Sequence, residues 1–168
     1  MKMNLRIMIQ VCMLIALEIV LSRFCSIATP IMKIGFGFVP IAMCGMLFGP
    51  VWAGFAGGIA DIIGAILFPI GAFFPGFTVS AILTGVVFGL FLFNRKESWE
   101  YLGCAVSINC IVISLGLSTY WLTIITGSPF IALLPARVLQ NIIIIPVQLI
   151  VLRLIQKLLI FYSKKQYV

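Results

Sequence analysis

Residues 51–68 read VWAGFAGGIADIIGAILF, an apolar run with one charged side chain, Asp61. The hydrocarbon core of a bilayer is about 30 Å thick, and an α-helix needs about 20 apolar residues to cross it. Small residues recur in the run at four-residue spacing, as at Gly54 and Gly58, which is typical of membrane helices that pack closely against a neighbour. This stretch therefore predicts a transmembrane helix with a tightly packed face.

Similar apolar runs fill most of the chain, and turn-forming Pro and Gly or polar residues separate them. The 168 residues are 63% hydrophobic and 9% charged, and six spans of about 20 residues leave no room for a second, soluble domain. We expect an all-α fold: a polytopic membrane protein whose six transmembrane helices form a bundle and a single integral membrane domain over residues 1–168. The expected spans are residues 5–27, 36–48, 51–68, 77–93, 102–125 and 130–161.

The distribution of Lys and Arg predicts the orientation of the chain. With six spans, both termini lie on one side of the membrane together with the polar loop 94–100. That side carries eight of the eleven cations, and short cytoplasmic loops are rich in Lys and Arg. We therefore expect both termini in the cytoplasm and a multi-pass protein of the cell (plasma) membrane. The eight cations are Lys2, Arg6, Arg95, Lys96, Arg153, Lys157, Lys164 and Lys165, and the outer three are Arg23, Lys33 and Arg137.

The residue types in the chain exclude several kinds of function. There is no His and there are only four acids, so neither a zinc site, a His-based triad nor a multi-carboxylate metal centre can be assembled. The phosphate-binding pattern G-x-x-x-x-G-K-[ST] is also missing. We expect no enzyme activity, no catalytic residues, no metal and no cofactor. A mean hydropathy of +1.27 makes nucleic acid a poor partner for the net charge of +7, which leaves anionic lipid or an anionic ligand.

Two polar residues in the last apolar run are candidates for a binding site. Arg137 lies two turns into the run, and Asn141 lies four residues further, hence on the same helix face. An Arg fork suits a carboxylate, and a side-chain amide suits the edge of a heterocycle. The alternative is that Arg137 snorkels to the outer membrane interface.

Two further cations fall on the same outer side. Arg23 ends the first run, where snorkelling is again the alternative, and Lys33 lies in the next loop, where the alternative is an ordinary solvated charge. This loop interleaves aromatic residues with Gly35 and Gly37. Together with Lys33, these glycines form a candidate gating loop that folds over a site and opens again.

Asp61 falls near the middle of its span, where an unpaired carboxylate is expensive. Pairing with Arg23 or Arg137, contact with an amino-heterocycle, and transfer of a coupling proton are all open roles. Aromatic residues crowd the outer half of the chain, and some of them form an interfacial belt. Beside three cations, they predict a pocket for a flat, anionic molecule. The candidates for this pocket are Phe24, Phe38, Phe73, Phe77 and Tyr120.

Five motifs carry a family resemblance. They are KIGFGFVPIA at 33–42, GMLFGP at 45–50, DIIGA at 61–65, GAFFPGFT at 71–78 and LPAR at 134–137. Together they resemble the folate-specific substrate-binding (S) component of energy-coupling factor (ECF) vitamin transporters. The resemblance covers nearly the whole chain, including its length, its six spans and its cytoplasmic termini.

The resemblance implies the S-component fold and a membrane subunit that binds folate, or a related anionic aromatic vitamin, from the outer side with high affinity. Arg137 and Asn141 match the ligand-facing positions expected on the last helix, and Arg23 matches the outer end of the first. The first connecting loop is expected to act as the gate.

The resemblance also implies partners: a transmembrane coupling subunit and two cytoplasmic ATPases, which supply the energy. Small residues on the first helices contact the coupling subunit in the family. In this chain the candidates for docking are Gly54, Gly58 and Gly64, and the alternative for them is close packing inside the bundle.

Other functions remain compatible with the residues. An S component for thiamin or riboflavin would share the architecture. A stand-alone ion-coupled carrier would use Asp61 as its proton site, and a purely structural assembly subunit would bind no small molecule.

Overall fold

The computed structural model describes residues 5–28, 33–69, 73–94 and 98–165. Within these ranges the chain is helical apart from one short hairpin and the connecting turns. Residues 99–126 form one continuous helical segment, so the described chain has six helical segments, as the sequence predicts. The elements are α1 (Leu5–Arg23), β1 (Ser26–Ala28), β2 (Lys33–Gly35), α2 (Phe38–Phe48), α3 (Pro50–Leu67), α4 (Pro75–Leu92), α5 (Trp99–Ile108), the π-helix η1 (Asn109–Ser118), α6 (Thr119–Thr126) and α7 (Phe130–Lys165).

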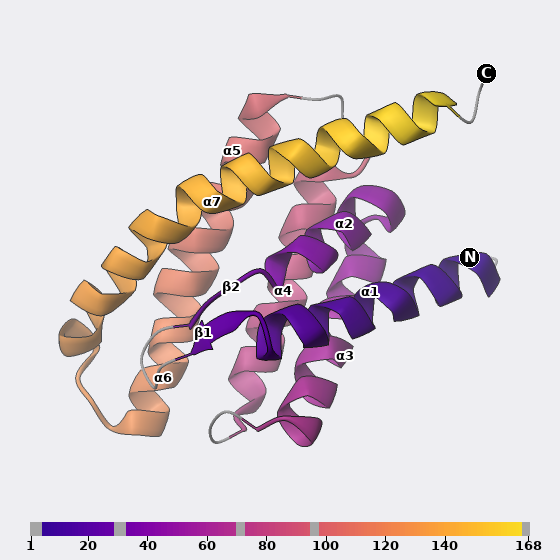
Figure 1. Cartoon of the computed structure of the whole chain (residues 1–168). Coiled ribbons are helices and arrows are strands. Elements are labelled where there is room, and N and C mark those ends of the chain that lie inside the picture. The colour runs from indigo at the N-terminus through magenta and orange to yellow at the C-terminus, as the bar shows by residue number, and fades with distance from the viewer. Residues whose placement is uncertain (1–4, 29–32, 70–72, 95–97, 166–168) are drawn as a thin grey trace.

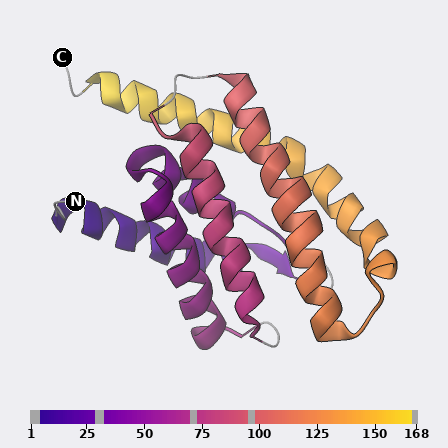
Figure 2. The same cartoon turned by 180° about the vertical axis from the view of Figure 1, so that it is seen from behind.

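The helices are arranged in two crossing groups (Figures 1 and 2). Helices α3, α4 and the α5–α6 segment stand side by side, whereas α1 and α7 cross them obliquely. Buried side chains of α2 join both halves of the interior: Ile41 packs with α4, α5 and α7, and Cys44 packs with α1 and α3. The start of α1 and the end of α7 lie on the same side of the molecule in both views.

Helix length decides which segments can cross a bilayer. Five of the segments in the described part are long and apolar enough: Leu5–Arg23, Pro50–Leu67, Pro75–Leu92, Trp99–Thr126 and Phe130–Leu159. Helix α2 has 11 residues and is about 16 Å long, roughly half of the hydrocarbon thickness. The chain is an all-α, multi-pass membrane protein in which α2 lies within the bundle.

The hairpin is the feature that the sequence analysis did not anticipate. The first span was expected to reach residue 27, but α1 ends at Arg23. The chain then turns, and Ser26–Ala28 pairs antiparallel with Lys33–Gly35, with Ser26 opposite Gly35. A Cβ added to Gly35 would lie 2.5 Å from the Cβ of Ser26, so the close approach of the two strands requires glycine at this position.

The small residues of α3 serve packing inside the chain. A Cβ added to Gly54 would lie 3.0 Å from Val86, and one added to Gly58 would lie 2.8 Å from Ile82, both on α4. A Cβ at Gly64 would lie 2.9 Å from Nε of Arg23. These contacts favour the alternative of close packing inside the bundle for the three glycines, because α4 and the Arg23 side chain occupy the space beside them. Their role in docking a coupling subunit stays a prediction.

Candidate functional site

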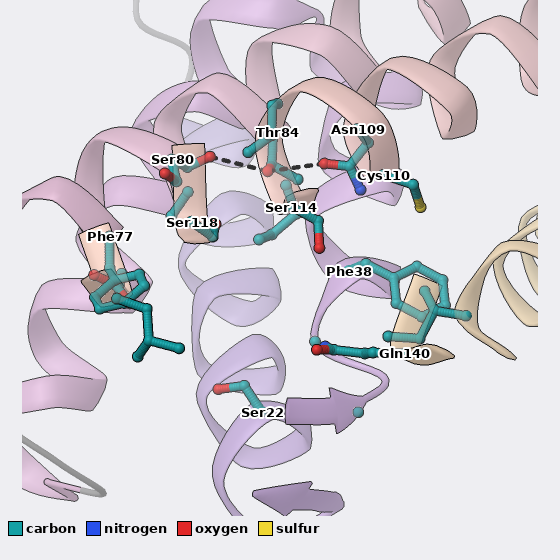
Figure 3. A pocket seen from close by; sticks show the side chains of 18 of the residues that line it. Ser22, Phe38, Phe77, Ser80, Thr84, Asn109, Cys110, Ser114, Ser118 and Gln140 are labelled. Atoms are coloured by element: carbon teal, nitrogen blue, oxygen red, sulfur yellow. Dashed lines mark hydrogen bonds between the residues drawn. The ribbon is translucent and has the colours of Figure 1, made fainter. Parts of the chain in front are cut away.

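The helices and the hairpin border a partly open cavity of about 690 Å³. This volume lies within the range of about 300–1,000 Å³ that is usual for small-molecule sites. Side chains from α1, α2, α3, α4, η1, α6 and α7 line it, together with Gly35 at the end of β2. Figure 3 shows this pocket, with Phe77, Ser80 and Thr84 entering from α4, Asn109 to Ser118 from η1, and Gln140 from α7.

Helix α7 contributes a row of buried polar side chains. Arg137, Gln140, Asn141 and Gln148 are between 4% and 8% exposed, and all four line the cavity. Nη1 of Arg137 donates to Oε1 of Gln140 at 3.3 Å. Since Arg137 is buried at the cavity, the snorkelling alternative does not describe its position.

Several of these buried atoms have no protein partner. Nε of Arg137 and both Nδ2 and Oδ1 of Asn141 make no hydrogen bond within the described residues. A buried polar atom without a partner costs about 1–3 kcal/mol. Unpaired groups that point toward one cavity are the arrangement expected of a site whose ligand supplies the missing partners.

Arg23 also reaches this site. It lies at the end of α1 and lines the cavity, and its Nε is buried without a hydrogen-bond partner among the residues described. Gly64 leaves room for its guanidinium beside α3. Glycine at this position explains how an Arg side chain can lie against α3 inside the bundle.

Asp61 lines the cavity, but it forms no ion pair with any arginine that the structure describes. In the described part of the chain its Oδ2 accepts a hydrogen bond from Thr78 Oγ1 at 2.8 Å. The expected alternatives of pairing with Arg23 or Arg137 are therefore not what the structure has. The Thr78 bond links α3 to α4 and holds the carboxylate at the edge of the cavity.

Three of the five predicted aromatic residues line the cavity: Phe38, Phe73 and Phe77. Phe24 and Tyr120 do not, and they are 66% and 55% exposed. Phe24 stacks edge-on against Phe68 and borders a separate apolar pocket of about 330 Å³.

Tyr120 packs on Trp121 with ring centroids 5.2 Å apart. The sequence made Tyr120 a candidate as one of the aromatic residues that crowd the outer half of the chain, where an aromatic side chain can also belong to the interfacial belt. Trp121 also packs against Phe74, with ring centroids 5.6 Å apart. Phe74 lines the cavity.

The predicted gating loop lies beside the cavity. Gly35 and Gly37 line it, and Lys33 lies in β2 opposite Ala28. A Cβ added to Gly37 would lie 2.9 Å from the Cβ of Ser22 on α1. The chain between the hairpin and α2 therefore passes directly over α1 at the cavity.

Sequence reasoning missed the polar residues of the deeper lining, which are Ser80, Thr84, Asn109, Ser114, Ser118, Gln140 and Gln148. A partial signal was present, because Ser80 and Thr84 are four residues apart in an apolar run and so share a helix face. The group from Asn109 to Ser118 gave no such signal. It lies on a π-helix, in which the backbone bonds run from i to i+5 and side chains align differently.

Comparison with known proteins shows extensive similarity. A family described as "ECF transporter, substrate-specific component" matches residues 6–156. The chain is 44% identical over 149 residues to "Folate transporter FolT" of Clostridium novyi (strain NT), which covers 89% of this chain and 87% of that protein. It is 32% identical to "Folate transporter FolT" of Leuconostoc mesenteroides subsp. mesenteroides, over 88% of this chain and 82% of that one.

A solved structure described as "Crystal structure of FolT bound with folic acid" has the same fold. It superposes with a TM-score of 0.84 at 34% sequence identity, over 88% of this chain and 90% of that chain.

Proposed function

Because the chain belongs to the family of substrate-specific components of ECF transporters, we propose that it is the membrane subunit that binds folate for an ATP-driven vitamin importer. The chain is a transport protein rather than an enzyme, as its relatives are. The proposal treats residues 1–168 as a single integral membrane domain.

The observation that carries the proposal is the pair Arg137 and Asn141 in the cavity. Both are buried, they lie one helical turn apart, and atoms of both lack partners in the described chain. Folate has carboxylates on its glutamate part, and an Arg guanidinium binds carboxylates through paired hydrogen bonds. Its heterocycle presents donors and acceptors side by side, and a side-chain amide matches such an edge.

The remaining lining fits the same ligand. Phe38, Phe73 and Phe77 offer rings on which flat groups can stack. Arg23 adds a second cation for a molecule with two carboxylates, and we propose that Lys33 adds a third when the loop that carries it closes. Phe24 and Tyr120 are left out of the proposed contacts, since they lie outside the cavity.

The proposal includes an orientation and partners. Both termini are cytoplasmic in the plasma membrane, folate enters from the outer side, and the β1–β2 hairpin acts as the gate. A transmembrane coupling subunit and two cytoplasmic ATPases complete the importer. The start of α1 and the end of α7 lie on the same side of the molecule, which supports the placement of both termini on one side of the membrane.

Binding by the purified chain is the first test. We expect the detergent-solubilised protein to bind radiolabelled folic acid at a ratio of one to one, and an excess of unlabelled folate to compete. Thiamin and riboflavin should not compete. Competition by either of them, or copurification of a different vitamin identified by mass spectrometry, would assign the site to that vitamin.

Transport is the second test, and it separates a partner-driven subunit from an ion-coupled carrier. In liposomes the chain alone should bind folate without concentrating it, even under an imposed proton or sodium gradient. Uptake should begin when the coupling subunit and active ATPases are added, and should stop with inactive ATPases. Concentrative uptake by the chain alone, abolished in Asp61→Asn, would establish the carrier instead.

A further inference from the structure

Asn109 is a buried polar residue of the cavity with one side of its amide held in place. It begins η1, is 7% exposed, and lies opposite Thr84 of α4. Oδ1 of Asn109 accepts a hydrogen bond from Thr84 Oγ1 at 3.0 Å. A carbonyl oxygen can only accept, so this bond turns the oxygen toward Thr84.

The other side of the amide is left for a ligand. Figure 3 shows the nitrogen of Asn109 on the side away from Thr84. Nδ2 carries two hydrogens, and it has no hydrogen bond to any residue that the structure describes. Asn109 thus presents donors rather than an acceptor to the interior of the cavity.

Thr84 is itself fixed by its surroundings. Its one hydroxyl hydrogen is shared between Oδ1 of Asn109 and the carbonyl oxygen of Ser80, which lies 2.9 Å from Oγ1 and one helical turn earlier. Ser80 Oγ in turn accepts from Nε1 of Trp121 at 3.2 Å. Two side-chain contacts, Thr84 with Asn109 and Ser80 with Trp121, therefore join α4 to the η1–α6 segment and preorganise the amide.

We propose that Asn109 determines ligand specificity by donating a hydrogen bond from Nδ2 to an acceptor atom on the edge of the bound heterocycle. Thr84 is a positioning residue, because it acts on the ligand through the orientation of Asn109. The inference rests on the proposed function, which supplies a heterocyclic ligand. The inference adds the requirement that the ligand carries a hydrogen-bond acceptor on the part of its ring that faces Asn109.

The test uses folic acid binding to purified variants. Asn109→Ala should raise the Kd about tenfold, as expected for the loss of one buried hydrogen bond. Asn109→Asp keeps an oxygen for Thr84 but has no amide donors, so it should lose at least as much affinity. Thermal unfolding of each variant checks that it is folded. If Asn109→Ala does not fold, the folic acid affinity of Asn109→Asp provides the test.

Thr84 is tested by rescue and by coupling. Thr84→Val should raise the Kd about fivefold, whereas Thr84→Ser keeps the hydroxyl and should stay within about twofold of wild type. In the Asn109→Ala background, Thr84→Val should have no further effect, because its partner is gone. Thr123→Val is the matched control, since Thr123 makes the same kind of bond to the carbonyl one turn earlier, at 2.8 Å, but does not line the cavity. This control should bind like wild type.

The outcomes separate this inference from the proposed function. If wild type binds folate and both Asn109 variants bind it equally well, the specificity role is overturned and the proposed function stands. If the effects of Thr84→Val and Asn109→Ala multiply in the double variant, Thr84 does not act through Asn109. Absence of folate binding by wild type would overturn the proposed function itself.

Discussion

At the residue level, Asn141 is the clearest case of a side chain placed for something other than folding. Both polar atoms of its amide are buried without a partner within the described part of the chain. The folded protein therefore carries a desolvation cost of about 1–3 kcal/mol at this position. Such a cost is explained if a ligand removes it.

We expect Asn141→Leu to raise the thermal stability of the ligand-free protein and to weaken folate binding. The change removes the unpaired amide and fills the same space with an apolar side chain. The measurement is thermal unfolding with and without folate, together with the Kd. Gln156→Leu is the control, because Oε1 of Gln156 is also buried and unpaired among the described residues but Gln156 does not line the cavity. It should stabilise the protein and leave binding unchanged. A loss of stability in Asn141→Leu would contradict this account.

Arg137 is expected to provide the main contact for a carboxylate. Arg137→Ala should weaken folate binding by more than about 1.5 kcal/mol, or more than tenfold, the lower end for a hydrogen bond to a charged group. Arg137→Lys should have an intermediate effect, because it keeps the charge and loses the paired geometry. Exposed Arg6 on α1 provides the control, and Arg6→Ala should bind normally. An unchanged Kd in folded Arg137→Ala would move the carboxylate contact to Arg23 or Lys33.

At the level of elements, the contact between α3 and α4 depends on glycines. A Cβ added to Gly85 would overlap the carbonyl oxygen of Ala53, and one added to Gly89 would overlap Pro50. Backbone atoms cannot move aside as a flexible side chain can. The two helices approach each other this closely only because these positions have no side chain.

Gly85→Ala should therefore destabilise the protein by about 1–3 kcal/mol, the usual range for overpacking. Gly103→Ala is the matched change on α5, where an added Cβ meets nothing within 4 Å. It should be neutral or stabilise the protein by up to about 1 kcal/mol, because Ala favours helix. Thermal unfolding in one detergent compares the two. Equal stability of both variants would show that α3 and α4 are not in close contact.

The helices of this molecule could be predicted from its sequence more fully than its site. The apolar runs and the Pro and Gly residues between them predict the helices, because a bilayer imposes a minimum apolar length. The α-helical period also predicts that Arg137 and Asn141 share a face. In contrast, Asn109 and Ser118 are nine residues apart, which in an α-helix is two and a half turns and places them on opposite faces.

The π-helix changes this relation. Its wider turn completes about two turns in nine residues, so both side chains reach the same cavity. The hairpin was missed for a related reason: its strands have three residues each, too few for an alternating pattern to be recognised. Phe24 and Tyr120 were misplaced because aromatic residues occur both in pockets and at the membrane interface.

At the level of the whole molecule, orientation in the membrane decides whether the cavity can receive a ligand from outside. Ser98 lies at the start of α5, where its side chain accepts a hydrogen bond from the backbone N–H of Glu100. It belongs to the loop 94–100, which is expected on the cytoplasmic side.

In a background without the native cysteines, Ser98→Cys should resist a membrane-impermeant thiol reagent in intact cells and react after the cells are opened. Ser128→Cys, in the connection between α6 and α7, should react in intact cells. The reverse pattern would invert the protein and place the cavity on the cytoplasmic side.

The unequal lengths of α2 and α7 have a consequence for the lipid around the protein. The apolar part of α7, Phe130–Leu159, has 30 residues and is about 45 Å long, well beyond the hydrocarbon thickness, whereas α2 covers only half of that thickness. Helix α7 accommodates its excess length by tilt, whereas α2 lies within the bundle and sets no limit on the thickness of the bilayer. Folate uptake should therefore depend on the acyl-chain length of the host membrane and decline toward shorter chains, which demand a larger tilt of α7.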